Sequence, residues 1–448
     1  MDFWIKAAQL LLSLAILITL HEFGHYIAAR AFKIRVEKFY LFFDPWFSLL
    51  KKKIGDTEWG IGWLPLGGYV KIAGMVDESM DKEQLAQPPK EDEFRSKPAW
   101  QRLVVMVGGV TVNIVLGFFI YILVVAAWGE NELRNESLNY GLAVNKEIRE
   151  LNIGLEDGDK IITVDGEPVK NVNLLNAQVF LRGYRILEVK KPTGNVQQVI
   201  LDEDFDDFMW DNDAFRAFSP RLHTVVDTIL PDTHAEKSGL LEGDSIISVN
   251  GVNTPFFHLF QEQLSEKSGD STKFELGIYR NDELITLSIF GVWNDKTNIY
   301  TFGFGNSIPA WLEMTHVDYT FGESISRGFT KAGWTMYDYA AQLPLIFTSK
   351  GISSVGGFGA IGNLFPPTWD WQVFWANTAF ISLVLAIMNI LPIPALDGGH
   401  IVFLFYEMIT GREAPQKVLE YAQLVGFIII LSLFVYANGN DVYRAFFE

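Results

Sequence analysis

Long apolar stretches alternate with more polar ones at four places along the chain. They run from about Trp4 to Phe32, from Leu103 to Trp128, from Phe374 to Leu396 and from Val418 to Ala437. The second contains 26 residues without a charged side chain, which is enough for a helix to cross a hydrocarbon layer of about 30 Å. We therefore predict four transmembrane helices. Buried helices of a soluble protein are the alternative for the first and fourth stretches.

Lys and Arg residues are concentrated between the first two apolar stretches. Residues 33–101 carry clusters such as Lys51–Lys53, whereas the N-terminus offers only Lys6 and the stretch after the second span begins with Arg134. Cytoplasmic loops are enriched in these residues. We therefore predict that residues 33–101 lie in the cytoplasm, and that residues 129–370 and both termini lie on the outer side.

The segment after the first span is typical of β-structure. Residues 34–75 are rich in Gly and aromatic residues and contain alternating runs at Ile61–Leu64 and Gly68–Ile72, which predict short strands joined by turns. Their apolar side chains predict a sheet that dips into the membrane interface. The charged, Pro-containing stretch 77–97 that follows is typical of a flexible cytoplasmic loop.

An internal repeat lies between the second and third spans. Gly154–Gly166 and Gly239–Gly251 share the pattern G-L-x-x-G-D-x-I-x-x-V-(D/N)-G. The pattern predicts a glycine turn, a short apolar strand and a D-G or N-G hairpin turn. It resembles PDZ domains of the bacterial protease type, which would occupy about residues 129–220 and 221–306. The acidic run Asp202–Asp213 in the first copy favours a solvated loop over a cation site.

Basic and aromatic residues alternate over residues 323–347. Arg327 and Lys331 are interleaved with Phe329 and Trp334. This pattern favours an amphipathic helix that lies on the outer membrane surface. A packed connector helix is the alternative.

Charge and cysteine content exclude several classes of function. The formal net charge is −18 and the chain has no cysteine. An acidic protein is poorly suited to bind phosphate backbones, so we expect no nucleic-acid partner. Disulfides and thiolate metal sites are excluded, and any metal must be held by His and carboxylate side chains.

The first span carries His21-Glu22-Phe23-Gly24-His25, an H-E-x-x-H motif. Residues four apart share one face of a helix, so both imidazoles can bind one zinc ion while Glu22 lies beside them as a base for the attacking water. The chain has only seven His, and a chance match has a probability on the order of 0.01. Ionisable groups inside an apolar helix are costly unless they are paired or metal-bound. The motif therefore favours a metal site over two core histidines.

A catalytic zinc site needs a third protein ligand. The candidate segment is Asn389–His400, where Pro392 and Pro394 break the third span. Backbone freed in this way is tolerated at membrane depth only where it is buried or lines a cavity. Asp397 and His400 both lie just past the break, and spacing does not separate them as the ligand.

The two motifs together resemble those of the site-2 protease family of intramembrane zinc metalloproteases. With the paired PDZ-like segments, the chain is most similar to the bacterial regulator-of-sigma-E protease type, and the resemblance covers essentially the whole sequence. It implies a zinc ion held by His21, His25 and Asp397, with Glu22 as the catalytic acid and base. It makes His400 a structural residue.

The same resemblance implies where a substrate binds. It assigns contacts with the substrate backbone to the amide of Asn389. It also matches Pro65–Val70 to the membrane-dipping β-segment of the family, in which Gly67, Gly68 and Tyr69 would hold a substrate strand.

The resulting architecture is a multi-span α-helical membrane protein with a membrane-associated β-rich segment and two tandem PDZ-like α+β domains. Two departures from the family concern helix geometry: Gly109–Asn113 in the second span and Ser354–Gly359 before the third both lack a usual proline. The predicted parts are a first transmembrane helix (1–32), a β-rich segment and loop (33–101), a second helix (102–128), PDZ-like domains (129–220 and 221–306), an interfacial helix and connector (307–370), a third transmembrane segment (371–410) and a fourth helix with the tail (411–448).

The resemblance implies regulated intramembrane proteolysis of single-span membrane proteins in the bacterial inner membrane. Anti-sigma factors are the expected substrates, together with signal-peptide remnants. The PDZ-like pair is expected in the periplasm, as a size filter or as a reader of the C-termini of pre-cleaved substrates, and the active site is expected near the cytoplasmic side. A non-enzymatic, membrane-anchored PDZ scaffold is the alternative. A proton-relaying transporter is a weaker one, because it would spread ionisable residues over several spans and the second span has none.

Overall fold

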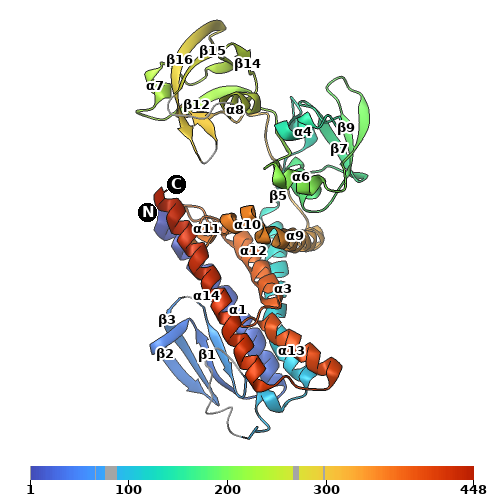
Figure 1. Ribbon diagram of the computed structural model, residues 1–448, viewed down its shortest axis with the longest axis vertical. Helices are drawn as coiled ribbons and strands as arrows, with labels where there is room; N and C mark the ends of the chain where they lie inside the picture. The colour runs from blue at the N-terminus through green and yellow to red at the C-terminus, as the bar shows by residue number, and fades with distance from the viewer. Residues whose placement is uncertain (1, 66, 76–87, 266–271, 296–297, 448) are drawn as a thin grey trace. The chain divides into compact units, whose positions relative to one another are not determined.

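The computed structural model describes residues 2–65, 67–75, 88–265, 272–295 and 298–447. The chain divides into two compact units (Figure 1). The first contains residues 1–129 and 318–448, and the second contains residues 130–317.

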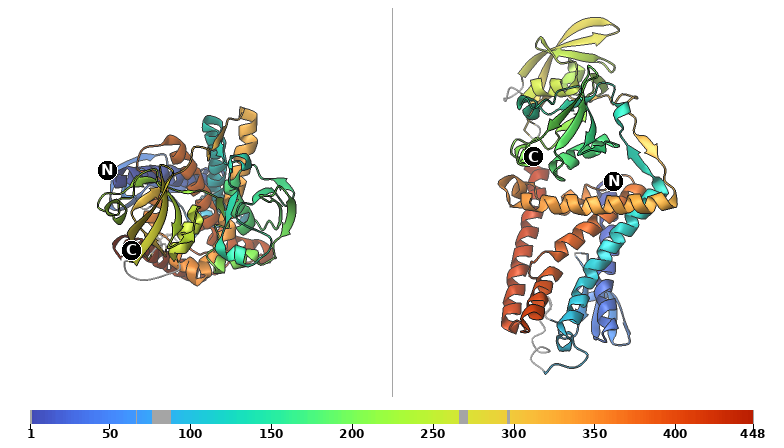
Figure 2. Two further views of the ribbon diagram at one scale, coloured as in Figure 1. Left: turned by 90° about the horizontal axis from the view of Figure 1, so that it is seen from above. Right: turned by 90° about the vertical axis from the view of Figure 1, so that its right-hand side faces the viewer.

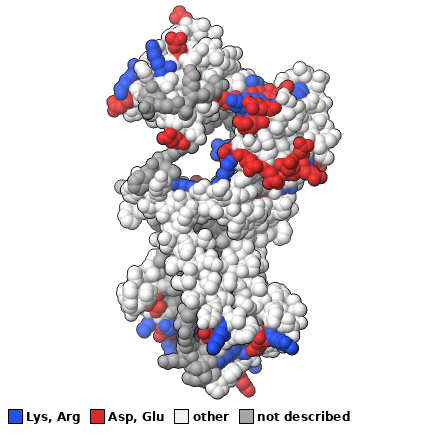
Figure 3. Space-filling view, in the orientation of Figure 1, with Lys and Arg blue, Asp and Glu red and all other residues white. Residues whose placement is uncertain are grey.

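Four helices of the first unit are long and apolar enough to span a membrane. They are α1 (Asp2–Ala31), α3 (Ala99–Trp128), α12 (Trp371–Ile390) and α14 (Gln416–Phe447). On the face drawn in Figure 3, the middle of this unit is almost free of charged side chains, which gather at its lower end. Each predicted span thus corresponds to a helix that is long and apolar enough to cross a membrane, although the third helix ends at Ile390, before the predicted Leu396.

Helices α1 and α3 cross at closely packed glycines. A Cβ atom on Gly24 would lie 2.4 Å from the carbonyl oxygen of Gly108, and one on Gly108 would lie 2.7 Å from the carbonyl oxygen of Gly24. A larger residue at either position would push the helices apart. Small residues commonly allow transmembrane helices to approach in this way. The crossing brings the backbone of α3 against the face of α1 that carries the H-E-x-x-H motif.

A four-stranded sheet packs beside α1. Its strands are β1 (Val36–Leu41), β2 (Phe43–Ile54), β3 (Thr57–Leu64) and β4 (Tyr69–Ile72), in the order β2-β3-β1-β4. Strand β1 runs parallel to β3 and antiparallel to β4. The strands predicted at residues 61–64 and 68–72 are thus confirmed, although β3 begins four residues earlier than predicted, at Thr57, and β4 begins one residue later, at Tyr69. Within the described part of the chain, β4 ends the sheet and its outer edge pairs with no strand.

The cytoplasmic loop predicted at residues 77–97 is described only from residue 88 onward, because residues 76–87 lie outside the described part of the chain. Its described portion contains a short 3₁₀ helix, η1 (Phe94–Ser96). The side chain of Phe94 is buried in a core cluster with Val105 and Met106 of α3. This end of the segment is therefore anchored to the helices.

Helix α9 (Phe321–Gln342) runs across the direction of α3 and α14 (Figure 2, right). A capping box that begins at Thr320 starts it. One face packs on α3, where a Cβ atom on Gly328 would lie 2.5 Å from the Cα atom of Ile122. Apolar residues such as Phe321 remain exposed elsewhere on the helix. The helix therefore packs as a connector on one side and keeps an apolar surface that suits a membrane interface.

A glycine-rich segment before α12 is tied to the end of α14. The carboxylate of Asp441 accepts hydrogen bonds from the backbone N–H groups of Gly357, Gly359 and Ala360 at 2.8–3.2 Å. Most of α14 is otherwise exposed in the unit, as expected for a helix that faces lipid. The short helices of this region are η4 (Leu343–Phe347), α10 (Ser349–Ser354) and α11 (Phe358–Gly362).

The second unit contains two β-rich lobes with separate hydrophobic cores. The first lobe has sheets of order β10-β9-β7-β8 and β11-β6, and the second has the order β17-β16-β15-β13-β12-β18 with β14 beside β13. A two-stranded sheet of β5 (Glu130–Glu132) and β19 (Thr315–Val317) joins the ends of the unit. The first lobe is built from β6 (Leu142–Val144), α4 (Lys146–Glu150), β7 (Lys160–Val164), β8 (Glu167–Pro168), α5 (Leu175–Phe180), β9 (Ile186–Lys190), β10 (Val196–Ile200), α6 (Phe205–Asp211) and β11 (Phe218–Pro220). The second is built from β12 (Thr224–Ile229), α7 (His234–Lys237), β13 (Ser245–Val249), β14 (Val252–Asn253), α8 (Phe257–Ser265), β15 (Thr272–Arg280), β16 (Glu283–Asn294), β17 (Ile299–Thr301) and β18 (Phe304–Asn306).

The internal repeat forms the same hairpin in both lobes. Asp165 and Gly166 have φ of 48° and 82°, and Asn250 and Gly251 have φ of 51° and 80°. Positive φ at both central residues is the signature of a type I′ turn. The predicted D-G and N-G turns are confirmed, and they join β7 to β8 and β13 to β14.

The structure also explains the aspartate that the two copies of the repeat share. Asp159 and Asp244 are each 1% exposed, and each accepts a hydrogen bond of 2.8 Å from the backbone N–H three residues before it. A cation from a neighbouring strand region completes each site: Lys191 lies 2.9 Å from Asp159, and Arg280 lies 2.6 Å from Asp244. Each aspartate therefore fixes the glycine turn to the sheet.

The expectation of a loop at Asp202–Asp213 is wrong. Residues 205–211 form α6, and the side chains of Phe205 and Met209 are buried in the core of the first lobe. The apolar residues lie four apart and share one helix face. Their spacing determines the structure, while the acids occupy the remaining face.

The two lobes contact each other through charged side chains. Asp157 of the first lobe lies 2.8 Å from His258 of α8 and 2.7 Å from Arg149, and Arg149 lies 2.6 Å from Glu262 of α8. Burial alone would raise the pKa of the Asp157 carboxyl. The hydrogen bonds from His258 and from the N–H of Val144 outweigh it, with the charges of His258 and Arg149, and lower the pKa to about 2.

We expect Asp157→Asn to weaken this contact at neutral pH by on the order of 1 kcal/mol, less than the full equivalent of the pKa shift because water screens the partly exposed carboxylate. Because the folded-state pKa lies below the ordinary value of 3.8, the contribution is present above about pH 4 and is lost as the pH falls towards 2. Hydrogen exchange at the Val144 amide and in α8, measured on the full-length protein, should show variant and wild type converging over that range. The exposed Glu150→Gln is the control. A difference that persists at pH 2 would contradict this account.

Candidate metal centre and substrate cavity

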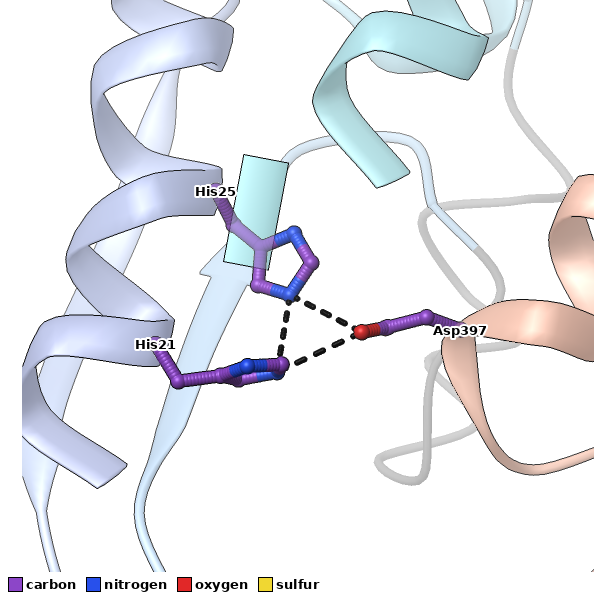
Figure 4. A group of neighbouring side chains, drawn as sticks. All are labelled: His21, His25 and Asp397. Carbon is purple, nitrogen blue, oxygen red and sulfur yellow. Dashed lines mark hydrogen bonds and ion pairs between the residues drawn. The ribbon is translucent and has the colours of Figure 1, made fainter. Parts of the chain in front are cut away.

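The two histidines of the H-E-x-x-H motif lie on one face of α1. His21 and His25 are one helical turn apart, and their Nε2 atoms are 3.2 Å from each other. The imidazole of His25 is buried. Both rings point towards the same side of the helix, where a third side chain meets them (Figure 4).

The third side chain is Asp397, the first residue of α13 (Asp397–Thr410). The turn before it departs from helical geometry at Pro392 and Pro394 and has Ala395 in the left-handed region with φ 76°. A Cβ atom on Gly398 would lie 2.0 Å from the carbonyl oxygen of Leu391, so a glycine is required for the turn to fold back on the helix start. This turn directs the carboxylate of Asp397 towards α1.

The structure distinguishes Asp397 from His400, the two candidates for the third metal ligand that spacing left open. Asp397 Oδ2 lies 3.3 Å from His21 Nε2 and 3.4 Å from His25 Nε2. His21, His25 and Asp397 form a cluster that could hold a metal ion, and His400 lines the same cavity without joining the cluster.

The geometry of the cluster fits a zinc ion. Tetrahedral zinc with ligand bonds of about 2.0–2.2 Å has its ligand atoms about 3.3 Å apart, and the three atoms here are separated by 3.2, 3.3 and 3.4 Å. Asp397 Oδ2 is buried and accepts no hydrogen bond from the described residues. A buried carboxylate oxygen without a donor is unfavourable, and a cation would satisfy it.

The cluster opens into a cavity of about 700 Å³. All the residues that the sequence assigned to proton transfer or substrate binding line it, namely Glu22, Asn389, Gly67, Gly68 and Tyr69. Asn389 Nδ2 is also 3.4 Å from His21 Nε2. The edge strand β4, together with Gly67 and Gly68 before it, supplies a continuous part of the wall, from residue 67 to residue 72. The structure thus places a candidate metal cluster, a carboxylate and a strand edge that pairs with no other described strand around one space.

Peptidase family M50 matches residues 9–433. The chain belongs to peptidase family M50. The regulator of sigma E protease from Haemophilus influenzae is 26% identical over 99% of this chain and 100% of its own length. The regulator of sigma-E protease RseP from Escherichia coli is 26% identical over 98% of each chain. A Vibrio cholerae protein provisionally named a zinc metalloprotease is 26% identical over 97% of each chain. The metallopeptidase predicted from the paired motifs is therefore confirmed.

In this M50 peptidase, the Nδ1 atom of each imidazole, which faces away from the cluster, contacts a polar group of α3. His25 Nδ1 lies 2.8 Å from the carbonyl oxygen of Val105, so Nδ1 carries the proton and Nε2 keeps its lone pair. His21 Nδ1 lies 3.2 Å from Nδ2 of Asn113, and the buried Oδ1 of Asn113 accepts no hydrogen bond from any described residue. A 180° rotation of this amide lets Oδ1 accept a hydrogen bond from the Nδ1–H group of His21. The buried oxygen then has a donor, and the ring nitrogen has an acceptor. Such partners orient metal-binding imidazoles.

Sequence reasoning missed two residues of this M50 site, Gly109 and Asn113 of α3. A Cβ atom on Gly109 would lie 2.4 Å from His25 Nε2 and 2.7 Å from His21 Cε1, so only glycine lets α3 pack against the imidazoles. Gly109 and Asn113 are four apart and share a helix face. This spacing is the feature of the sequence that indicates their role, although the missing proline at Gly109–Asn113 predicted only a change in helix geometry.

We expect Gly109→Ala to lower the zinc affinity of the full-length protein by at least about 10–100-fold, as other losses of ligand orientation do. The added methyl group would displace the imidazoles, while the helix propensity of α3 would not suffer. Metal analysis of purified protein over a series of zinc-buffered solutions would measure the effect, with circular dichroism to verify the helix content. Gly333→Ala in α9 is the matched control, because a Cβ atom there meets nothing within 4 Å. Unchanged zinc affinity in Gly109→Ala would refute the contact.

Proposed function

We propose that this chain is a zinc endopeptidase that cuts single-span membrane proteins within or beside the bilayer. His21, His25 and Asp397 hold the zinc ion, and Glu22 is the catalytic acid and base. The observation that carries the proposal is a triangle of two imidazole nitrogens and one orphaned carboxylate oxygen, with edges of 3.2–3.4 Å. The triangle is built partly on α1, which is long and apolar enough to span a membrane.

The proposed mechanism assigns a proton to one side chain. A bound zinc ion supplies Lewis acidity, which polarises the scissile carbonyl and acidifies the attacking water. Glu22 directly follows His21 and lines the cavity. Its carboxylate takes the proton of the attacking water and later delivers it to the leaving amine. The side-chain amide of Asn389, which reaches the same space, hydrogen-bonds the substrate backbone and orients it.

The substrate is proposed to bind as an extended strand along β4. A transmembrane substrate hides its carbonyl groups in helical hydrogen bonds, so it must unwind before it can be cut. The outer edge of β4, which pairs with no strand among the described residues, offers replacement hydrogen bonds through β-augmentation. Gly67 and Gly68, at the start of this wall, carry no side chain and let another backbone approach. Tyr69 then supplies the first side chain of the binding edge.

The second unit is proposed to select substrates before they enter the membrane site. The repeated motif and its paired type I′ turns support an assignment of residues 129–220 and 221–306 as PDZ-like domains. On the outer side of an inner membrane, they would exclude bulky substrates or bind the C-termini of proteins already trimmed by another protease. The names of the curated relatives support anti-sigma-factor-like substrates, and remnants of signal peptides are of the same single-span class.

A membrane-anchored scaffold without enzymatic activity is the remaining alternative. It would need neither a buried carboxylate beside two imidazoles nor a cavity along a free strand edge. Metal binding and cleavage therefore distinguish the two functions.

We expect Glu22→Gln to retain zinc but to lower the cleavage rate by about 10²–10⁴-fold, because the general base is lost while the ligands remain. Asp397→Ala should lose both zinc and activity. The assay would combine metal analysis with cleavage of single-span membrane substrates in detergent or nanodiscs. Glu420→Gln in α14, outside the lining of the cavity, is the control. Wild-type activity in Glu22→Gln, or equal zinc in Asp397→Ala, would remove that residue from its role.

We also expect the size of the substrate's outer domain to control cleavage. A single-span substrate whose outer domain has been trimmed to a short tail should be cut faster than the same substrate with the domain intact. The comparison uses one transmembrane sequence throughout, so that only access past the second unit differs. Equal rates for both substrates would argue against a filter and leave the metal site unaffected.

A further inference from the structure

A carboxylate of the membrane-associated sheet is bonded to the first residue of its edge strand. Asp44 Oδ1 accepts a hydrogen bond of 2.9 Å from the hydroxyl of Tyr69, and Asp44 Oδ2 accepts one of 3.0 Å from Ser48. Asp44 belongs to β2 and Tyr69 to β4, which lie at opposite ends of the order β2-β3-β1-β4. The bond therefore links two strands that are not neighbours in the sheet.

An irregular start of β2 makes this link possible. Phe43 pairs with Leu64 and Ser48 with Gly62, so five steps along β2 correspond to only two along β3. The extra residues fold away from the ladder, as in an extended β-bulge. Two bulky residues at the bulge, Phe42 and Trp46, have φ of 66° and 72°. This left-handed geometry is unfavourable for such residues and tends to occur at functional sites.

Further contacts hold the bulge in place. The indole N–H of Trp63 donates a hydrogen bond of 2.8 Å to the carbonyl oxygen of Pro45. A Cβ atom on Gly62 would lie 2.1 Å from the carbonyl oxygen of Phe43, so the close approach requires a glycine. The backbone on both sides of Asp44 is therefore fixed by β3, and its carboxylate has a defined position.

The ring of Tyr69 is fixed as well. It stacks against the rings of Tyr40, at 5.3 Å and 11°, and Phe43, at 6.1 Å and 10°. The neighbouring phenol has a different acceptor, because the hydroxyl of Tyr40 donates to Glu58 at 2.7 Å. Each of the two phenols therefore donates to its own carboxylate, Tyr40 to Glu58 and Tyr69 to Asp44. The same Tyr69 lines the cavity beside the metal cluster.

We propose that Asp44 is a positioning residue for substrate binding. Its hydrogen bond to Tyr69 holds the start of β4 in the extended form that an incoming substrate strand pairs with. Strand β4 has four residues and, in the described part of the chain, pairs only with β1, and short edge segments open easily. A pre-ordered edge lowers the entropy that must be lost when a partner binds. This inference rests on the proposed role of β4 as the substrate-binding edge.

The test is a double-mutant cycle in the full-length protein with a single-span substrate. Asp44→Ala and Tyr69→Phe should each raise KM by about 5- to 10-fold, the range for loss of a hydrogen bond to a charged group, with little change in kcat. The double variant should resemble either single variant, because both remove the same bond. Zinc content should remain that of the wild type, since neither residue belongs to the metal cluster.

Two further variants separate the bond from general damage to the sheet. Asp44→Asn keeps an oxygen that can accept from Tyr69, so it should stay close to wild-type KM. Asp56→Ala is the control at the β2–β3 turn. The Asp56 side chain is 66% exposed, and its ion pair with Arg30 is long, at 3.9 Å. The thermal unfolding midpoint of every variant would be measured alongside.

Three results would overturn the inference while wild-type cleavage stands: wild-type KM in Tyr69→Phe, multiplicative effects in the double variant, or a kcat loss without a change in KM. Absence of cleavage by the wild-type protein would instead overturn the proposed function. The two failures are therefore distinguishable in one set of measurements.

Discussion

The structure depends on the close approach of two apolar helices around ionisable side chains. Ionisable groups in a hydrocarbon layer are tolerated only when they are paired or bound to a metal, so the imidazoles of α1 must meet their partners without gaps. Gly24 and Gly108 let the helices touch, and Gly109 places bare backbone against both rings. Without these glycines, Asp397 would have no cluster to complete.

The parts of the chain that regular secondary structure cannot supply lie around the same cavity. Asp397 comes from a turn with Ala395 at φ 76°, and the binding edge is linked to a bulge with Phe42 and Trp46 in the left-handed region. Irregular backbone at membrane depth is acceptable where it lines a cavity or is buried in protein. The two irregular segments stand on rigid elements, the first turn of α13 and the ladder of β3. Local strain is therefore supported by regular structure on each side.

The sequence predicted what depends on local spacing. The four spans, the strands near the first helix, the I′ turns and the H-E-x-x-H cluster each follow from short-range patterns, and all have counterparts in the structure. Spacing did not decide between Asp397 and His400 as the third candidate ligand, because only the fold of the turn brings one of them to the two histidines. The role of Gly109 was not predicted, because it depends on the lack of a side chain, which no chemical group in the sequence indicates. The loop expected at Asp202–Asp213 failed because charge was weighed above the four-residue spacing of Phe205 and Met209.

The hydrogen bond between Asp44 and Tyr69 could not be predicted from local patterns in the sequence. The residues are 25 positions apart, on strands whose order in the sheet is not their order in the chain, and their contact exists only because β2 carries extra residues. No periodicity encodes a bulge that reaches across two strands. Yet the physical requirement behind it is general: in the proposed function, a peptide bond must be held still beside the metal cluster, and a four-residue edge strand provides little rigidity for this. In our proposal, a carboxylate anchored elsewhere in the sheet supplies that rigidity.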